Sequence, residues 1–230
     1  MKARQGTAGM PKAAAQSARG LDFYASPFAA LPPLLAQEGR KLPRHLWEPA
    51  CGNGALVLPL RNRGFSVYAS DIVDRGCPDA SVSDFFQFNL SCSFGGIVTN
   101  PPFDGAAGGI EDFTEHACRF VPYVAIFARL AWFEGAGRHG WWKRVGLSRI
   151  IKIADRLPMM HREGYEGPKL SNSGQCFGWF IFEPGKKQKP FIPVYSRLWK
   201  EDAKRFPMMD ADAPPTAKDQ TLPLFAEVAA

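Results

Sequence analysis

The sequence predicts an α/β domain built on a mostly parallel sheet. A short stretch at 45–47 leads into a Gly-x-Gly turn at Gly52 and Gly54, and strand, turn and helix in this order open a unit of an α/β sheet. Further along, the β-branched run 97–99 ends in polar Asn100 and two prolines, as a buried strand does where its ladder must stop. With 230 residues, 46% of them hydrophobic, the chain is long enough for one domain with a core.

The expected elements alternate along the chain. Ser26 can cap a helix that starts near Pro27. Strands are expected at 45–47, 65–71, 80–82, 97–99, 121–127, 148–154 and 175–183, and the clearest helix at 110–120. The domain is expected to span 20–206, between a disordered basic tail at 1–19 and a flexible C-terminal tail at 207–230.

The first half of the chain carries residues suited to a nucleotide-like ligand. Glycines at 52 and 54 let a ligand approach the backbone, but Val57 stands where a dinucleotide-binding fingerprint would have its third glycine. Glu48 before the turn suits a cation, such as the ammonium and sulfonium of S-adenosylmethionine, better than a pyrophosphate. Asp71 ends the next strand 19 residues after Gly52, where an acidic side chain accepts hydrogen bonds from ribose hydroxyls. The alternatives are that Gly52 and Gly54 form a plain tight turn and that Asp71 is a surface aspartate at the end of a strand.

Two aromatic stretches extend this pattern. Phe23 and Tyr24 would either cover a cofactor or staple the helix that follows. Asp84 and Phe85 would either hydrogen-bond and enclose an adenine ring or form an ordinary turn into the core.

The stretch from Asn100 to Phe103 suits the activation of an amine. An exocyclic amine conjugated to a ring or a carbonyl is a poor nucleophile, because its lone pair is delocalised. Two acceptors aimed at its hydrogens, the Asn100 side-chain oxygen and the Pro101 carbonyl, would favour the pyramidal and more reactive form. Pro102 stiffens the turn, and Phe103 would stack on a planar base, as aromatics do on flipped nucleotides. The alternative is a strand-end turn with a buried aromatic.

Two later segments are candidates for substrate contact. Residues 131–147 interleave aromatic and basic side chains, including Trp141, Lys143 and Arg144, which fits either nucleic-acid contact or an amphipathic helix that buries its tryptophans. The long polar segment 156–174 is nominated as a recognition loop through three basic side chains: His161, Arg162 and Lys169. A net charge of +6 and a pI of about 9.1 are compatible with a polyanionic partner.

The composition argues against several classes of protein and of site. The sequence contains no run of 18 or more apolar residues, so no membrane span is expected. The five cysteines are odd in number and form no Cys-x-x-Cys pair, so neither a disulfide framework nor a zinc site is expected, and no other metal site is predicted. A reduced, cytoplasmic protein is the expectation.

The motifs, taken in order, resemble those of a known family. They are Phe-Tyr-Ala-Ser-Pro at 23–27, Glu-Pro-Ala-Cys-Gly-Asn-Gly at 48–54, Ser-Asp-Ile at 70–72, Ser-Asp-Phe-Phe at 83–86 and Asn-Pro-Pro-Phe at 100–103. This set, covering about residues 21–183, resembles the class I S-adenosylmethionine-dependent methyltransferases, above all the DNA adenine-N6 amino-methyltransferases. The resemblance implies a Rossmann-like, seven-stranded, mostly parallel sheet with an antiparallel last strand and helices on both faces.

The resemblance also implies a role for each matched position. Tyr24 and Pro27 would flank the methionine end of S-adenosylmethionine, and the methionine and ribose would be lined by Glu48, Ala50, Gly52 and Gly54. Asp71 would bind the ribose hydroxyls, and the adenine would meet Ile72, Asp84 and Phe85. The target amine and its base would be held by the catalytic stretch of Asn100, Pro101, Pro102 and Phe103, and Asn100 would also contact the cofactor.

The expected activity is methyl transfer to the N6 amine of adenine in nucleic acid, DNA rather than RNA. Alternatives are the same catalysis on an RNA base or a protein glutamine, and a non-catalytic nucleic-acid or clamp-docking module. Cytosine-C5 methylation is disfavoured because no Pro-Cys dipeptide occurs, Cys77-Pro78 being the reverse order.

Two features of the chain bear on its partners. Family members that read long DNA sites usually carry a separate recognition domain. This chain offers only the segments 131–147 and 156–174 and a short tail, so it is not expected to recognise a long site by itself. The stretch from Gln220 to Phe225 resembles the bacterial sliding-clamp binding motif, with one residue too many between Gln220 and Leu222.

Overall fold

The computed structural model describes residues 26–88, 93–103, 109–154, 157 and 175–186, together with the backbone of 194–196. Several predictions concern residues outside this part of the chain: both tails, Tyr24, the side chains His161, Arg162 and Lys169, and the clamp-like stretch 220–225. None of the helices within the described ranges is long and apolar enough to cross a membrane.

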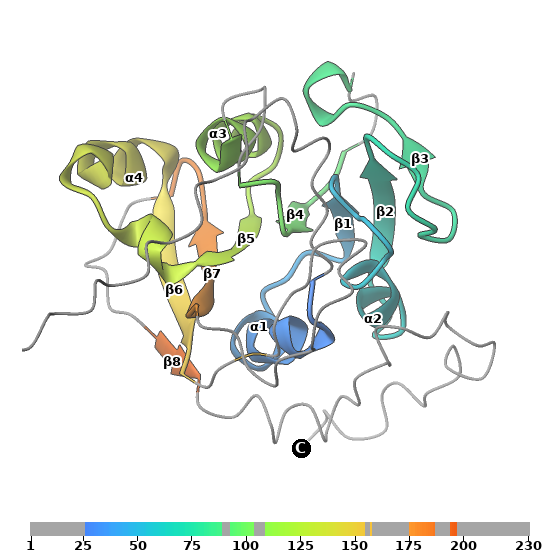
Figure 1. Ribbon diagram of the computed structural model, residues 1–230, viewed down its shortest axis with the longest axis horizontal. Helices are drawn as coiled ribbons and strands as arrows, with labels where there is room; N and C mark the ends of the chain where they lie inside the picture. Colours follow the sequence, from blue (N-terminus) through green and yellow to red (C-terminus); the bar gives the residue numbers. More distant parts are fainter. Residues whose placement is uncertain are drawn as a thin grey trace, which may run out of the picture.

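Eight strands form one sheet, in the order β3-β2-β1-β4-β5-β7-β6-β8 (Figure 1). The strands are β1 His45–Glu48, β2 Ser66–Asp71, β3 Ser81–Val82, β4 Gly96–Thr99, β5 Val124–Arg129, β6 Leu147–Ile153, β7 Phe177–Phe182 and β8 Val194–Ser196. Only β7, inserted between β5 and β6, runs antiparallel to its neighbours. The predicted mostly parallel sheet with an antiparallel last strand is therefore confirmed, and β8, which pairs with β6, adds a strand that was not predicted.

Helices cover both faces of the sheet, as predicted. They are α1 Leu31–Glu38, α2 Val57–Arg61, α3 Gly109–Phe120 and α4 His139–Val145, with the short 3₁₀ turns η2 Phe28–Ala30, η3 Phe85–Gln87, η4 Leu130–Phe133 and η5 Ala136–Arg138. In Figure 1, α1 and α2 lie on one side of the strands, and α3 and α4 on the other. Each pair closes its own apolar core against the sheet. The sheet is thus sealed on both faces, so a ligand can reach its strands only at their ends.

The start of the first helical segment differs from the prediction. Pro27, not Ser26, precedes η2, and no side chain caps this turn. Pro32 and Pro33 fall in the first turn of α1, where a missing backbone N–H costs little. The prediction that Ser26 caps a helix is therefore wrong, and its hydroxyl is used elsewhere.

The segment 131–147 buries two of its tryptophans. Trp132 and Trp142 are 6% exposed, and Trp142 stacks on Phe180 of β7 with ring centroids 5.8 Å apart. Of the two interpretations of this segment, the amphipathic helix that packs its tryptophans into the core is the one that the structure shows.

A buried ion-pair network joins α1 to the late strands at the amino ends of the sheet. Arg149, near the start of β6, donates from Nε to Glu38 Oε1 over 2.8 Å and also pairs with Glu183, just after β7. Glu38 is 2% exposed. Partial burial raises the pKa of Glu183, but hydrogen bonds from Lys186, Arg149 and Ser148 outweigh it and hold that pKa at about 2. This pKa lies below the ordinary value of about 4.3, so the stabilisation is present above that pH and is lost as the pH falls towards 2.

We predict that Arg149→Met lowers the free energy of unfolding by about 3–5 kcal/mol, because it leaves buried Glu38 with only the exposed Lys41 as a charge partner. Urea denaturation at pH 7 measures the change. The matched control is Arg144→Met, which removes a 67% exposed arginine from a surface pair and should cost about 1 kcal/mol or less. Equal losses in the two variants would contradict the assignment.

Candidate functional site

The candidate site lies where neighbouring parallel strands end. Glu48 and Asp71 are the last residues of β1 and β2, and Asn100 directly follows β4. Since the sheet order is β2-β1-β4, the three polar side chains stand at adjacent strand ends. The chain runs from β1 outward to β2 and β3 on one side and continues with β4 and β5 on the other. Ligands bind in the crevice at such a switch point in open α/β sheets.

Asp71 ties the glycine turn to the end of β2. Its Oδ2 accepts from the Gly52 N–H over 2.8 Å, and its Oδ1 accepts from the Val73 N–H over 3.2 Å. Gly54 has a φ of +84°, and a Cβ there would come within 3.0 Å of the Cys77 sulfur. A carboxylate offers about four lone-pair sites, so Asp71 can still accept hydrogen bonds from a ligand.

Glu48 is a buried carboxyl group with one unused oxygen. It is 1% exposed, and its Oε1 accepts from the Ala50 N–H over 3.1 Å. Thr99 faces it and lowers its pKa against the larger effect of burial, yet neither Glu48 Oε2 nor Thr99 Oγ1 makes a hydrogen bond of ordinary geometry within the described residues. Burial, helped by the nearby negative charge of Asp71, raises the pKa of Glu48 to about 8. The side chain is therefore largely neutral at pH 7 until a cation lies beside it.

Asn100 is held at one end of its amide and free at the other. Its Nδ2 donates to Ser26 Oγ over 2.9 Å, whereas its Oδ1 is buried without a hydrogen-bond partner in the described part of the chain. Three buried polar atoms thus lack hydrogen-bond partners at the ends of β1 and β4: Glu48 Oε2, Thr99 Oγ1 and Asn100 Oδ1. An unpaired buried polar atom costs about 1–3 kcal/mol, so this grouping indicates a place for a polar ligand.

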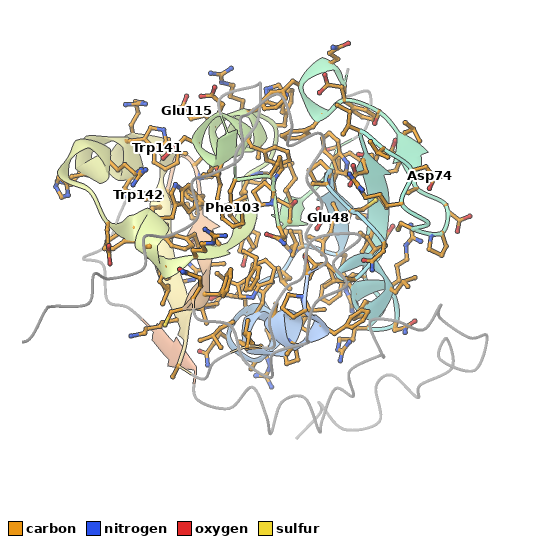
Figure 2. The ribbon with its side chains drawn as sticks, viewed as in Figure 1. Glu48, Asp74, Phe103, Glu115, Trp141 and Trp142 are labelled. Carbon is orange, nitrogen blue, oxygen red and sulfur yellow. The ribbon has the colours of Figure 1, made fainter. Side chains whose placement is uncertain are left out.

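The turn after Asn100 presents an aromatic ring. Pro101 is buried, Pro102 is exposed, and Phe103 is half-buried against the core under α3 and α4. Gly109, the first residue of α3, has a φ of +74°, and a Cβ there would come within 2.9 Å of the Phe103 carbonyl oxygen. The Arg129 guanidinium, at the end of β5, lies over the Phe103 ring, 5.4 Å from its centroid. Figure 2 shows Phe103 and Glu48 near the middle of the molecule.

The predicted adenine contacts are only partly placed at this edge. Ile72 follows β2 and is 50% exposed at this edge, as Val82, Phe120 and Phe133 are elsewhere among the described residues. Asp84 caps η3 by accepting from the Phe86 N–H over 2.9 Å. Phe85 is 4% exposed and stacks on Phe113 with centroids 4.2 Å apart. Its ring therefore packs in the core, and the contact of Phe85 with adenine stays a prediction.

The predicted substrate contacts on α4 are partly engaged within the protein. Trp141 Nε1 and Arg144 Nη2 both donate to Glu115 Oε1 of α3, each over 2.7 Å, and Figure 2 shows Trp141 and Glu115 on the α3–α4 side. Lys143 is exposed. In this structure, Trp141 and Arg144 therefore join α4 to α3. No cluster of His, Cys, Asp or Glu suited to a metal ion occurs among the described residues.

Sequence reasoning missed two residues of this edge. Ser26 was interpreted as a helix cap, since Ser-Pro is typical of helix starts. Arg129 was passed over, although a charged residue directly after the apolar run of β5 indicates a strand end at the ligand edge.

Comparisons with known proteins bear on the fold. No model of a known protein family and no curated protein matches the chain. Among solved structures, a protein of Pyrococcus horikoshii described as a candidate RNA methyltransferase is 13% identical, with 67% of this chain and 83% of that chain covered and a TM-score of 0.48. Magnesium protoporphyrin IX methyltransferase of Synechocystis, solved with bound S-adenosylmethionine, is 14% identical over 68% and 77% of the two chains, with a TM-score of 0.45.

A third structure is the methyltransferase subunit of a type I restriction-modification system from Streptococcus thermophilus. It is 12% identical, with 80% of this chain covered and a TM-score of 0.49. The chain spans about half of that subunit, 53% of its length.

We predict that Glu48→Gln stabilises the free protein more at pH 8 than at pH 5, by at least about 1 kcal/mol. The folded pKa of about 8 lies above the unfolded value, so Glu48 destabilises the fold increasingly as the pH rises from about 4 to 8. Urea denaturation at both pH values measures the difference. The control is Glu115→Gln: Arg144 lowers the pKa of Glu115, so its contribution is complete above about pH 4.3 and the effect of this variant should be the same at both pH values. A Glu48→Gln effect that does not change with pH would contradict this prediction.

Proposed function

We propose that this chain is an S-adenosylmethionine-dependent N-methyltransferase that acts on the N6 amine of adenine in DNA. The observation that carries the proposal is the buried Asn100 Oδ1, which lacks a hydrogen-bond partner within the described residues at the end of β4. An acceptor in this state suits a ligand that brings an N–H donor, and an exocyclic amine brings two.

The residues at the ends of β1 and β2 fit the chemistry of S-adenosylmethionine. Glu48 would hold the cationic methionine end, Asp71 the ribose hydroxyls, and exposed Ile72 one face of the adenine. The backbone at Gly52 and Gly54 would lie along the ligand. When bound, S-adenosylmethionine supplies an electrophilic methyl group on a sulfonium.

The residues after β4 would prepare the acceptor. Asn100 Oδ1 and the Pro101 carbonyl would accept the two amine hydrogens, which concentrates the lone pair on nitrogen. Phe103 would stack on the base and fix its plane. The amine nitrogen would gain the methyl group as the methyl–sulfur bond breaks with its electron pair going to sulfur, and would lose one proton to solvent, so no strong general base is required. The main contribution of the protein is positioning and electrostatic stabilisation.

A nucleic-acid substrate is supported by the charge around the acceptor. The Arg129 guanidinium lies directly over the Phe103 ring, next to the place proposed for the base. A cation there suits a phosphate-bearing substrate better than a neutral protein amide, and the chain as a whole carries a net charge of +6. The same catalysis on an RNA base or a protein glutamine is the second candidate. Docking of residues 220–225 to a sliding clamp, a cytoplasmic location and substrate contacts from the 156–174 segment stay predictions.

We predict that Asn100→Ala lowers methyl transfer at least about a hundredfold and changes cofactor affinity far less. The assay follows labelled methyl from S-adenosylmethionine into duplex DNA, single-stranded DNA, RNA and protein, with nucleoside digestion of the product. Asp71→Ala is the converse variant and should weaken cofactor binding by about 1–3 kcal/mol, measured by calorimetry.

The destination of the label separates the candidates. Label in N6-methyladenosine of DNA supports the proposal, whereas label only in RNA or protein replaces the substrate. Cofactor binding without transfer to any of the four substrates, or no cofactor binding at all, would overturn the catalytic assignment in favour of a binding module.

We predict that Arg129→Ala raises KM for DNA and reduces by about one the slope of log affinity against log salt, while cofactor affinity stays the same. The control is Arg40→Ala, which removes an exposed arginine just after α1, before the chain enters β1 at the amino edge. If both variants change the salt slope equally, Arg129 contributes only general charge.

A further inference from the structure

We propose that Ser26 is a positioning residue that fixes the orientation of the Asn100 amide. The inference rests on the proposed function, because it concerns the acceptor that would activate the amine. The Ser26 hydroxyl accepts a hydrogen bond from Asn100 Nδ2 over 2.9 Å, between residues that lie 74 positions apart in the chain. This contact joins the segment before α1 to the end of β4.

The two ends of the Asn100 amide are chemically opposite. Its NH₂ group only donates and its oxygen only accepts, whereas the amine of a base presents two donors. The orientation shown, with Nδ2 on Ser26, leaves Oδ1 as the buried, unpartnered end. A half-turn of the amide would place NH₂ against NH₂, so that neither the amine nor the side chain finds an acceptor. Only one of the two orientations is therefore competent.

A hydroxyl can accept from NH₂ or donate to an oxygen, but once a base amine bonds to Oδ1, the Ser26 hydroxyl is the acceptor that remains for Nδ2, and its position is fixed. The residue before a proline is restricted to extended backbone, so Pro27 limits how Ser26 can move. The Pro27 carbonyl accepts from the Ala30 N–H over 2.9 Å, and the Ala30 carbonyl accepts from Trp179 Nε1 of β7 over 2.6 Å. Ala29 and Ala30 are fully buried. The segment that carries Ser26 is thus anchored to the centre of the sheet.

A role as a helix cap does not account for Ser26. No side chain caps η2, and Pro27 itself holds the cap position. The hydrogen bond that the structure shows for the Ser26 side chain is the one with Asn100, the residue that carries the proposed function.

The test compares Ser26→Ala, Ser26→Thr and wild type in the methyl-transfer assay on DNA. Ser26→Ala removes the acceptor, so a fraction of the amides turns and kcat should fall about tenfold, with KM for DNA and the Kd for S-adenosylmethionine within about twofold of wild type. Ser26→Thr keeps the hydroxyl and should restore most of kcat. The control is Ser148→Ala, which removes a hydroxyl bonded to Glu183 and Arg149 far from this edge and should lower stability but not kcat.

A second readout needs no activity. The side-chain NH₂ signals of Asn100 in nitrogen–proton NMR spectra, assigned by their loss in Asn100→Ala, should shift in Ser26→Ala and return in Ser26→Thr. A wild-type kcat in Ser26→Ala, or unchanged Asn100 signals, would overturn the role of Ser26 alone. A wild type that transfers methyl to no amine would instead overturn the proposed function, so the two failures are distinguishable.

Discussion

The parallel strands β1 and β4 end side by side between two sealed helical layers, and the candidate site depends on this constraint. Strand residues inside the sheet satisfy their backbone groups through the ladder, but the side chains at the strand ends must find partners of their own. Glu48, Thr99 and Asn100 each keep one polar atom without a hydrogen-bond partner there, in the part of the chain that the structure describes. A fold that leaves such atoms unpaired at one edge is prepared for a ligand rather than for maximal stability.

The two halves of the proposed reaction use this edge differently. On the β1–β2 side, the glycine turn and the Asp71 carboxylate form a pre-built cradle, because the Gly52 N–H is already bound to Asp71. On the β4–β5 side, the groups are not yet arranged for a ligand. The Arg129 guanidinium lies over the Phe103 ring, where a base would stack, and the Asn100 oxygen has no hydrogen-bond partner among the described residues. The first side would therefore change little on binding, and the second would rearrange.

Much of the fold was predictable because its strong signals are local. The apolar runs of β5 and β7, the prolines after β4 and the glycine turn each determine structure within a few residues, and the predicted strands follow them. The contacts that could not be predicted join distant parts of the chain. Ser26 bonds a residue 74 positions away, and Phe85 joins a core that includes Trp47 and Phe113, neither of which local spacing reveals. From the sequence alone, Trp141 and Arg144 fit nucleic-acid contact as well as packing within the protein. Their hydrogen bonds to Glu115 of α3 become known only from the structure.

The hydrogen bond from Trp179 to the Ala30 carbonyl spans 149 residues, and the Arg149–Glu38 pair spans 111. The first helix of the chain is therefore docked by its last predicted strands, although every residue of the proposed acceptor site precedes position 130. During synthesis, the whole motif set has left the ribosome before the strands that hold α1 in place exist. A nascent chain therefore carries the complete set of motifs before α1 can dock, and the synthesis of β7 sets the earliest moment at which this docking can occur.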